Sequence, residues 1–423
     1  MKSKIVSFVL LCVFANTANL FSQTIENLRE EEALSLSEAL RIAYTQNPEM
    51  IQVRREIDAA KGRRIQAEAL PDPEVEFEIG GLKKEDGHRK GNLDSFDIKQ
   101  PLDPFGTRFL RASIAKDNIK IAKGDLNVVW ARVREQALEL YATILAEQKA
   151  LEVARDNLSA TRQFFTQVET RYQSGNALQS DVIRARIEVS RSENDLLISQ
   201  KNLQVAKGQL NLVLGRPVET GFELTDTLTY EALQYEYQVI KQEAFARRAD
   251  LLNEKIRIKA REKGFGSALL KTFLPKSSIG VERFTESFEN DTAILVSFSY
   301  PLWGFNLGEV KEAKAEKEKQ KVRYEALERE VGLEVYQGFL EAELADKQVQ
   351  IQKKANDEAN ELLRQITLRY EEGSVAFLTY LENIKTIKET RLAYFNALKT
   401  YKEKVAELER VIQATPIPEG VSS

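Results

Sequence analysis

The sequence predicts a mainly α-helical protein with a small β part, in which one pattern occurs twice. Gln100-Pro101-Leu102 returns as Tyr300-Pro301-Leu302, and Arg171-Tyr172-Gln173-Ser174-Gly175 returns as Arg369-Tyr370-Glu371-Glu372-Gly373. Asn47-Pro48-Glu49-Met50 and Leu70-Pro71 have looser counterparts, in the same order, at Arg248-Ala249-Asp250-Leu251 and Leu274-Pro275. Repetition at a nearly constant spacing of roughly 200 residues indicates a duplication of about half the chain.

The spacing of proline predicts that each half is dominated by long helices. No proline lies between Pro104 and Pro217, or between Pro301 and Pro416, and both stretches are rich in strong helix formers. Because proline breaks helix interiors, we expect one long helical hairpin over about 107–214 and another over about 307–413. The return helix of the first hairpin carries a coiled-coil seam that repeats every seven residues, formed by Val182, Val189, Leu196, Leu203 and Leu210.

The N-terminus has the form of a secretory signal peptide, which we place at 1–22. Lys2 and Lys4 precede an apolar run from Ile5 to Ala15, and small and polar residues follow. A buried N-terminal helix is the alternative. Cys12, the only cysteine, lies in this run, and the sequence does not decide whether it carries a lipid.

The remaining elements follow in order along two repeats, at 23–218 and 219–413, before a flexible tail at 414–423. A helix should run from the capping box at Ser35 to about Ala69, with a bend at Pro48. Strands are expected at about 73–81 and 94–101 in the first repeat, with a polar loop over 83–92 between them. The second repeat should have strands at about 278–285 and 292–300.

The strands alternate apolar and polar side chains, which is typical of a two-faced sheet. One predicted face carries Val75, Phe77, Ile79, Phe96, Ile98, Ile294, Val296 and Phe298; the other carries Glu74, Glu76, Glu78, Asp97 and Lys99. A half-solvated sheet of a soluble α+β protein has this pattern, and so does a set of tilted strands that cross a bilayer. In the bilayer interpretation, the second group of side chains would line a water-filled lumen.

Four strands cannot close a barrel, because about eight are needed and unpaired strand edges are not tolerated in lipid. If the strands enter a membrane, several copies must therefore combine them. Three copies would supply an even number, twelve, as bacterial barrels require.

The motifs together resemble the TolC-like outer-membrane efflux proteins. The resemblance rests on Leu36-Ser37-Glu38-Ala39-Leu40, Asn47-Pro48-Glu49, Leu70-Pro71, Gln100-Pro101-Leu102 and Arg171-Tyr172-x-x-Gly175 followed by Asp181-Val182. It implies a homotrimer with a shared 12-stranded β-barrel in the lipid of the cell outer membrane and an α-helical tunnel through the periplasm. It also implies a periplasmic adaptor and an inner-membrane pump of the RND or ABC type as partners, in tripartite efflux or type I secretion.

The resemblance also implies a constriction at the periplasmic tip of the tunnel. Asp181 stands where the family prefers an aspartate, whereas the second repeat has Thr379 at the matching position and Glu382 three residues later. We therefore expect Asp181 and Glu382 to form a ring of carboxylates that favours cations. Arg171, Tyr172, Arg369 and Tyr370 are either contacts that hold neighbouring hairpins closed or simple turn residues.

The composition argues against an enzyme and against a nucleic-acid partner. The 61 basic and 65 acidic residues nearly balance, whereas phosphate-binding proteins usually carry a basic surplus. The single histidine, His88, lies in a charged segment, and a His-based triad or a His/Cys zinc site cannot be built, so no cofactor is expected.

Two alternative functions remain compatible with the residues. A periplasmic adaptor is also secreted and carries a hairpin, but normally a single one. A structural coiled-coil protein of the cell envelope would leave the alternating strands unexplained.

Overall fold

The computed structural model describes residues 32–85, 88–103, 106–286, 289–300 and 305–413. The expected signal peptide, Cys12 and the expected tail lie outside these residues. The chain divides into two compact units. Unit 1 comprises Met1–Ile51, Val129–Ala246 and Gly332–Ser423, and unit 2 comprises Gln52–Val128 and Arg247–Val331.

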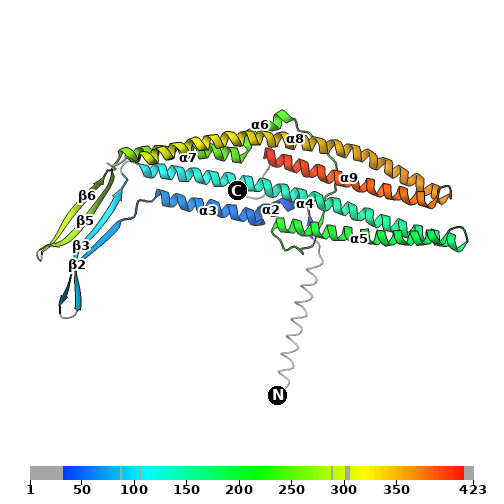
Figure 1. Ribbon diagram of the computed structural model, residues 1–423, viewed down its shortest axis with the longest axis horizontal. Coiled ribbons are helices and arrows are strands. Elements are labelled where there is room, and N and C mark those ends of the chain that lie inside the picture. Colours follow the sequence, from blue (N-terminus) through cyan, green and yellow to red (C-terminus); the bar gives the residue numbers. More distant parts are fainter. Residues whose placement is uncertain (1–31, 86–87, 104–105, 287–288, 301–304, 414–423) are drawn as a thin grey trace, which may run out of the picture. The chain divides into compact units, whose positions relative to one another are not determined.

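Unit 1 is built mainly from two helical hairpins (Figure 1). α4 (Thr107–Gln173) enters from unit 2 and turns back as α5 (Gln179–Leu214). In the second repeat, α8 (Leu307–Glu371) turns back as α9 (Phe377–Ile412). The predicted seam of α5 faces inward at both ends, because Val182 and Leu210 are buried. The expected long helices are thus confirmed, with interior prolines absent from all four.

Smaller elements complete unit 1. β1 (Glu32–Leu34) pairs in parallel with β4 (Phe222–Leu224), and so joins the beginnings of the two repeats. α2 (Leu36–Gln46) is capped by Ser35, whose Oγ accepts a hydrogen bond from the Glu38 N–H, as the capping motif predicts. α6 (Tyr237–Arg247) is the corresponding short helix of the second repeat.

The expected bend at Pro48 is a complete break between two helices. α2 ends at Gln46, and α3 (Pro48–Glu68) starts afresh with proline in its first position. Asn47 caps the new helix, since its Oδ1 accepts hydrogen bonds from the N–H groups of Glu49 (2.8 Å) and Met50 (3.2 Å). The second repeat has the same break, at Arg248 between α6 and α7 (Ala249–Phe273).

Unit 2 contains a four-stranded antiparallel sheet in the order β2-β3-β5-β6. Its strands are β2 (Glu74–Glu85), β3 (His88–Leu102), β5 (Lys276–Glu286) and β6 (Glu289–Ser299). The predicted polar loop over 83–92 was wrong: β2 continues to Glu85, and β3 resumes at His88. Cross-strand pairs such as Lys83 with Lys90 continue the ladder there, so backbone pairing prevails over side-chain polarity.

The helices of unit 2 approach closely at one glycine. A Cβ on Gly124 of α4 would collide with the side-chain amide of Asn253 of α7, so a larger residue there would displace this amide. The buried Asn253 amide donates hydrogen bonds to the Ile121 carbonyl (3.2 Å) and to Asp125 Oδ1 (2.7 Å). Among the described residues, none of the helices is both long and apolar enough to span a bilayer.

Candidate functional site

The repeated motif Arg-Tyr-x-x-Gly is a helix C-terminus that forms both hairpin turns. Gly175 and Gly373 have φ values of 79° and 74°, in the left-handed region that favours glycine. The Asn176 N–H donates to the Arg171 carbonyl (2.8 Å), and the Ser374 N–H donates in the same way to the Arg369 carbonyl (2.9 Å). This is the Schellman arrangement, which satisfies carbonyls that have no partner within the helix. The motif therefore has a structural role in both repeats.

The side chains of the two motifs nevertheless have different surroundings. Tyr370 is 4% exposed, whereas Tyr172 at the equivalent position is 43% exposed. The Arg171 guanidinium lies 5.0 Å from the centre of the Tyr370 ring and donates a long hydrogen bond (3.5 Å) to the Tyr370 carbonyl. Arg369, the counterpart of Arg171, is exposed. One Arg–Tyr pair thus joins the two hairpins within the chain, and its counterparts remain on the surface.

Tyr370 belongs to an aromatic cluster that connects the hairpins. The rings of Tyr370 and Tyr380 stack at 4.6 Å between centroids, and each lies 5.0 Å from the ring of Phe164. Burial raises the pKa of the Tyr370 hydroxyl, which the nearby charge of Arg171 partly offsets. Phe164 and Tyr380 stand in neither repeated motif, and the only sequence signal for their burial is the apolar spacing around Phe164.

The two carboxylates predicted at the tip lie at different levels of their helices. Asp181 is in the first turn of α5, where its Oδ2 accepts a hydrogen bond from the Leu178 N–H (3.4 Å). Glu382 is exposed and lies three residues beyond Thr379, the counterpart of Asp181, which corresponds to about 4.5 Å along a helix. The structure therefore brings Arg171 and Tyr370 together, and leaves Tyr172, Arg369 and Glu382 on the surface of the chain.

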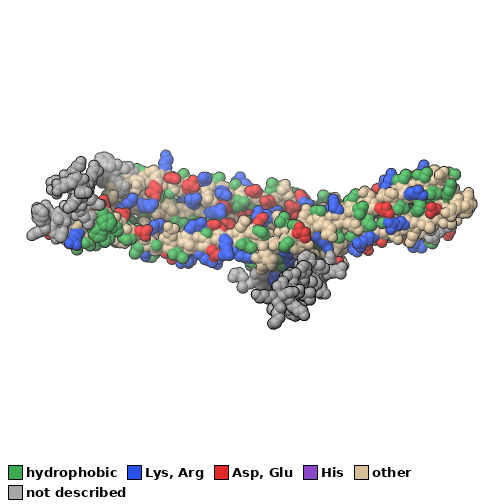
Figure 2. All heavy atoms as spheres, turned by 90° about the horizontal axis from the view of Figure 1, so that it is seen from below, with side chains coloured by type: hydrophobic (Ala, Val, Ile, Leu, Met, Phe, Trp, Pro, Cys, Tyr) green, Lys and Arg blue, Asp and Glu red, His purple; other side chains and the backbone are tan. Residues whose placement is uncertain are grey.

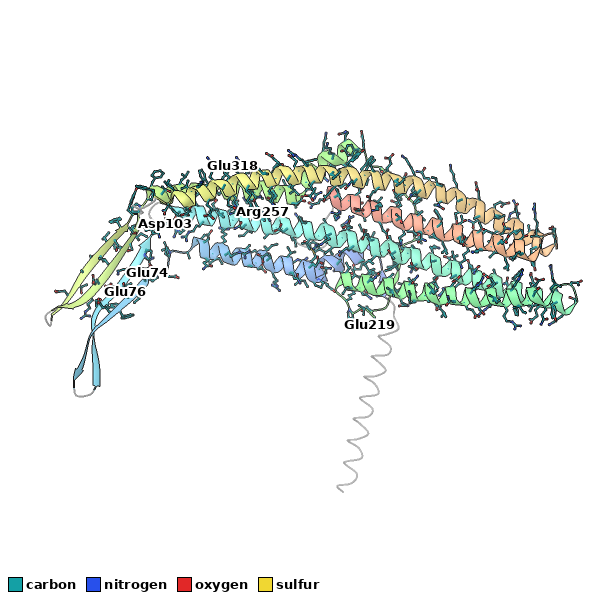
Figure 3. All side chains as sticks on the ribbon, viewed as in Figure 1. Glu74, Glu76, Asp103, Glu219, Arg257 and Glu318 are labelled. Carbon is teal, nitrogen blue, oxygen red and sulfur yellow. The ribbon has the colours of Figure 1, made fainter. Side chains whose placement is uncertain are left out.

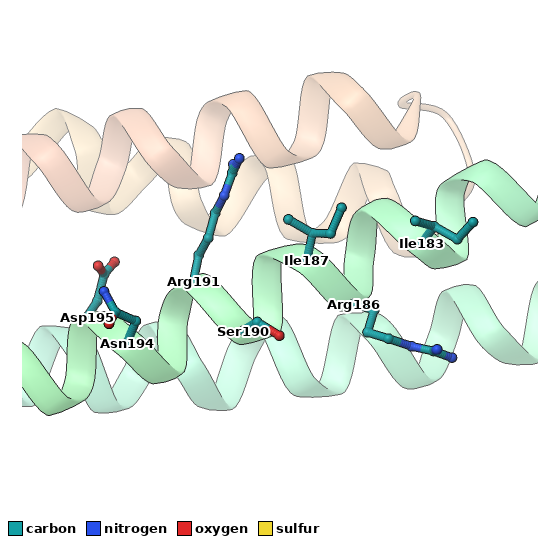
Figure 4. Close-up of a pocket in the computed structure, with 7 residues that line it drawn as sticks. All are labelled: Ile183, Arg186, Ile187, Ser190, Arg191, Asn194 and Asp195. Atoms are coloured by element: carbon teal, nitrogen blue, oxygen red, sulfur yellow. The ribbon is translucent and has the colours of Figure 1, made fainter.

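An open hollow of about 530 Å³ lies along one face of α5 near the tip (Figure 4). Ile183 and Ile187 are exposed on it, beside Arg186 and Arg191. Arg186 also lies over the ring of Phe165 at 5.7 Å. An exposed apolar patch rimmed by polar residues marks a candidate site of contact with another protein surface.

The polar face of the sheet carries the five residues predicted for a lumen. Glu76 of β2, Asp97 of β3 and Glu282 of β5 stand opposite one another in register. Lys99 forms ion pairs with Glu76 and Asp97, both at 3.1 Å. Glu74, which pairs with Lys99 across the strands, and Glu78 are exposed, whereas Asp97 is buried; Figure 3 labels Glu74 and Glu76 on β2.

The opposite face of the sheet is apolar and exposed. Val75, Ile98, Val281 and Ile294 form one row across all four strands, and each is at least 42% exposed. Phe77 and Phe96 pair beside this row with their ring centroids 5.0 Å apart. A contiguous apolar sheet face of this kind indicates contact with lipid or with another protein surface.

Comparison with protein families identifies the class to which these features belong. Residues 39–216 and 240–412 match the family described as "Outer membrane efflux protein". The two matched segments correspond to the two repeats, and the chain belongs to this family. It is an outer-membrane efflux channel with its helical hairpins in the periplasm.

Individual relatives agree with this assignment. The chain is 21% identical to "Cobalt-zinc-cadmium resistance protein CzcC" of Cupriavidus metallidurans over 388 residues, which cover 90% of each protein. It is 22% identical to "Pyoverdine export outer membrane protein OpmQ" of Pseudomonas putida, over 84% of this chain and 81% of that protein. The fold is similar to that of the MtrE outer membrane channel of Neisseria gonorrhoeae, with a TM-score of 0.72, 18% identity, and coverage of 89% and 88%.

Proposed function

We propose that three copies of this chain form one channel, through which an inner-membrane pump expels its substrates with the help of a periplasmic adaptor. The observation that carries the proposal is the sheet with an exposed apolar face and two unpaired edges. Among the described residues, β2 and β6 each pair with a strand on one side only. In lipid such edges leave backbone N–H and C=O groups without partners, each at a cost of several kcal/mol. Pairing of β6 of one copy with β2 of the next removes every edge.

The hairpin tips supply a second contact between copies. Within a chain, Arg171 of the first repeat lies over Tyr370 of the second. In a closed ring the repeats alternate, so the second repeat of one copy faces the first repeat of the next. The same motif then places Arg369 over Tyr172 of the neighbouring copy. This contact accounts for the exposure of both side chains in the single chain.

Cysteine crosslinking tests this ring. In a Cys12→Ser background, Tyr172→Cys/Arg369→Cys is treated with a short bifunctional thiol reagent in intact cells. We expect covalent dimers and trimers on a denaturing gel, and none from either single cysteine variant. If the double variant gives only an internally linked monomer, the proposed order of repeats around the ring is wrong.

At the tip, Asp181 and Glu382 would place two tiers of carboxylates around the threefold axis. Rings of negative charge favour cations and bind multivalent cations. Conductance of Asp181→Ala/Glu382→Ala channels in planar bilayers tests this arrangement, with Glu389→Ala, an exposed carboxylate of α9, as the control. Cation preference and block by multivalent cations should fall in the double variant alone. If both persist, the carboxylate ring is wrong.

The adaptor would contact the hollow on α5, where Ile183 and Ile187 are exposed. A photo-crosslinking amino acid at Ser190, within this hollow, should capture a periplasmic protein that carries a helical hairpin, identified by mass spectrometry. Capture of other copies of this chain alone would show that the hollow lies between protomers.

The proposed substrates of the channel are the molecules that the partner pump delivers to it. One relative is named for cobalt, zinc and cadmium resistance, and another for pyoverdine export, so the family accommodates different substrates.

A further inference from the structure

Unit 2 contains a hollow of about 570 Å³ that is lined by residues of four helices, α3, α4, α7 and α8. The helices follow the order of the strands that they adjoin, because α3 precedes β2, α4 follows β3, α7 precedes β5 and α8 follows β6. In a flat layer of helices packed about 8–10 Å apart, the first and the fourth helix would be about 25 Å from one another. Since both line the same hollow, the layer curves, and the hollow lies on its concave side.

The opposite faces of these helices are aromatic where they approach the sheet. Phe109 lies about two and a half turns before Asn118, a lining residue, and therefore projects from the opposite face of α4. Phe273 lies about two and a half turns after Gly264, another lining residue, and projects from the opposite face of α7. Both phenylalanines are 70% exposed. Because exposed aromatic side chains near the bilayer are typical of the outer surface of a membrane channel, the hollow faces the interior of the proposed channel.

The charged side chains that line the hollow carry a basic surplus. The chain as a whole has 61 basic and 65 acidic residues, and Figure 2 shows basic and acidic side chains interspersed along the helices. The hollow departs from this balance with four arginines and two carboxylates: Arg63, Arg257, Arg261, Arg323, Glu56 and Asp125. Such a surplus inside a concave surface favours an anionic ligand.

Two of the four arginines are held by carboxylates. Arg63 forms a hydrogen-bonded ion pair with Glu56. Arg257, labelled in Figure 3, donates a hydrogen bond to Glu254 Oε1 (3.1 Å). Glu254 is 5% exposed and also accepts a hydrogen bond from the Gln320 amide. The guanidinium groups of Arg63 and Arg257 are thus fixed in position by neighbouring side chains.

The donors of Arg261 and Arg323 remain available. Arg261 lies 3.9 Å from Glu316 Oε2, and Arg323 lies 3.8 Å from Glu254 Oε1, both beyond hydrogen-bonding distance. Neither guanidinium makes a hydrogen bond within the described part of the chain. Their side chains are 55% and 66% exposed, respectively. Because each guanidinium carries five N–H groups, both can bind a ligand in the hollow.

Arg323, Arg257 and Arg261 follow one another along the contact between α7 and α8, and we call them the arginine row. Arg257 and Arg261 are one turn apart on the same face of α7. Arg323 of α8 lies beside Glu254, which is about one turn before Arg257. The distance along α7 from Glu254 to Arg261 is about 10 Å. A row of this length suits an extended anion with several charged oxygens better than a single small ion.

We propose that the arginine row binds multivalent oxyanions inside the channel, so that polyanionic molecules are among its substrates. The inference rests on the channel proposed above. Arg261 and Arg323 donate to oxygens at the two ends of the anion, and Arg257, held by Glu254, faces its middle. Arginine forms strong, often bidentate, charge-assisted hydrogen bonds with such oxygens. This level of the channel would bind anions, in contrast to the carboxylates proposed at the tip.

Conductance in planar bilayers tests the arginine row, with the full chain and inorganic tripolyphosphate as the probe. We expect tripolyphosphate to block the current of the wild type. Arg261→Gln/Arg323→Gln should raise the half-blocking concentration about tenfold or more, as loss of two charge-assisted contacts predicts. The control Lys123→Gln/Lys259→Gln removes two exposed lysines from the opposite faces of α4 and α7, and should be blocked as the wild type is.

Calorimetric titration of the purified chain in detergent separates this proposal from that of the channel, because all the lining residues belong to one chain. Tripolyphosphate should bind more tightly than orthophosphate, and the single variants Arg261→Gln and Arg323→Gln should each weaken its binding by a few fold. Absence of current from the wild type would contradict the channel, whereas absence of tripolyphosphate binding would overturn the hollow. Equal block and equal binding by the double variant and its control would also overturn it. Equal binding of orthophosphate and tripolyphosphate would overturn the assignment to an extended anion.

Discussion

Glu139 offers a quantitative test of how the two hairpins pack in unit 1. It lies on α4 among Glu135, Glu403 and Glu407, with Lys404 as a nearby cation. Burial, followed by repulsion from these carboxylates, raises the pKa of Glu139 from 4.5 to about 7. The positive charge of Lys404 does not fully offset this repulsion, because Lys404 already forms ion pairs with Glu341 (2.5 Å) and Glu407 (2.9 Å).

Proton linkage determines how the ionisation of Glu139 changes the stability of the fold with pH. Because its pKa is higher in the folded state, the folded protein binds the Glu139 proton more tightly than the unfolded chain does. The stabilising contribution of the protonated form is complete below pH 4.5 and is lost as the pH rises through about 7. Converted at about 1.4 kcal/mol for each pKa unit, and reduced for partial exposure and coupling to Glu135, the cost at pH 8 is about 1–2 kcal/mol.

Glu139→Gln removes this ionisation and should therefore stabilise the protein in a pH-dependent way. At pH 8 we expect a gain of about 1–2 kcal/mol in the free energy of unfolding, and at pH 5 a change below about 0.5 kcal/mol. The assay is urea unfolding in detergent, followed by the far-UV circular dichroism of the helices. Glu147→Gln, on the same helix, controls for the loss of a carboxylate as such.

An equal effect of Glu139→Gln at both pH values would refute the reasoning, since a purely steric or packing change does not titrate. A loss of stability at pH 8 would refute it more strongly, because the carboxylate would then be favourably solvated or paired.

Four further substitutions, in two matched pairs, test other parts of the structure. Phe77→Arg, on the exposed apolar face of the sheet, should hinder membrane insertion by about 2–4 kcal/mol. Glu76→Arg, on the polar face, should be tolerated. Equal yields of the two variants in outer-membrane fractions would contradict the assignment of the faces. Gly215→Ala should destabilise unit 1 by more than about 1 kcal/mol, because Gly215 has a φ of 72° and a Cβ would collide with the Gln46 carbonyl oxygen. Gly62 lies within α3, and a Cβ there would meet no neighbouring atom, so Gly62→Ala should instead stabilise the fold by about 0.5–1 kcal/mol. Equal midpoints in thermal melts of the Gly215→Ala and Gly62→Ala variants would contradict both predictions.

The larger features could be predicted from the sequence because they depend on local rules. Proline-free stretches determine where long helices can run, and the period-two alternation around Val75 and Phe77 predicts which side chains share a face of the sheet. The capping role of Ser35 follows from sequence spacing alone. The extension of β2 to Glu85 was missed, because pairing with a partner strand outweighed the polarity of the segment.

The sequence by itself determined the duplication, which follows from comparison of the two halves. It also determined the hairpins and the Arg-Tyr-x-x-Gly turns, since each of these follows from residues close together along the chain. Only the tertiary structure decided that Tyr370 is buried and Tyr172 exposed, and that Arg257, Arg261 and Arg323 line one hollow. The physical reason is that burial and charge pairing depend on which segment lies opposite. Two identical motifs acquire different environments when one faces its own chain and the other does not.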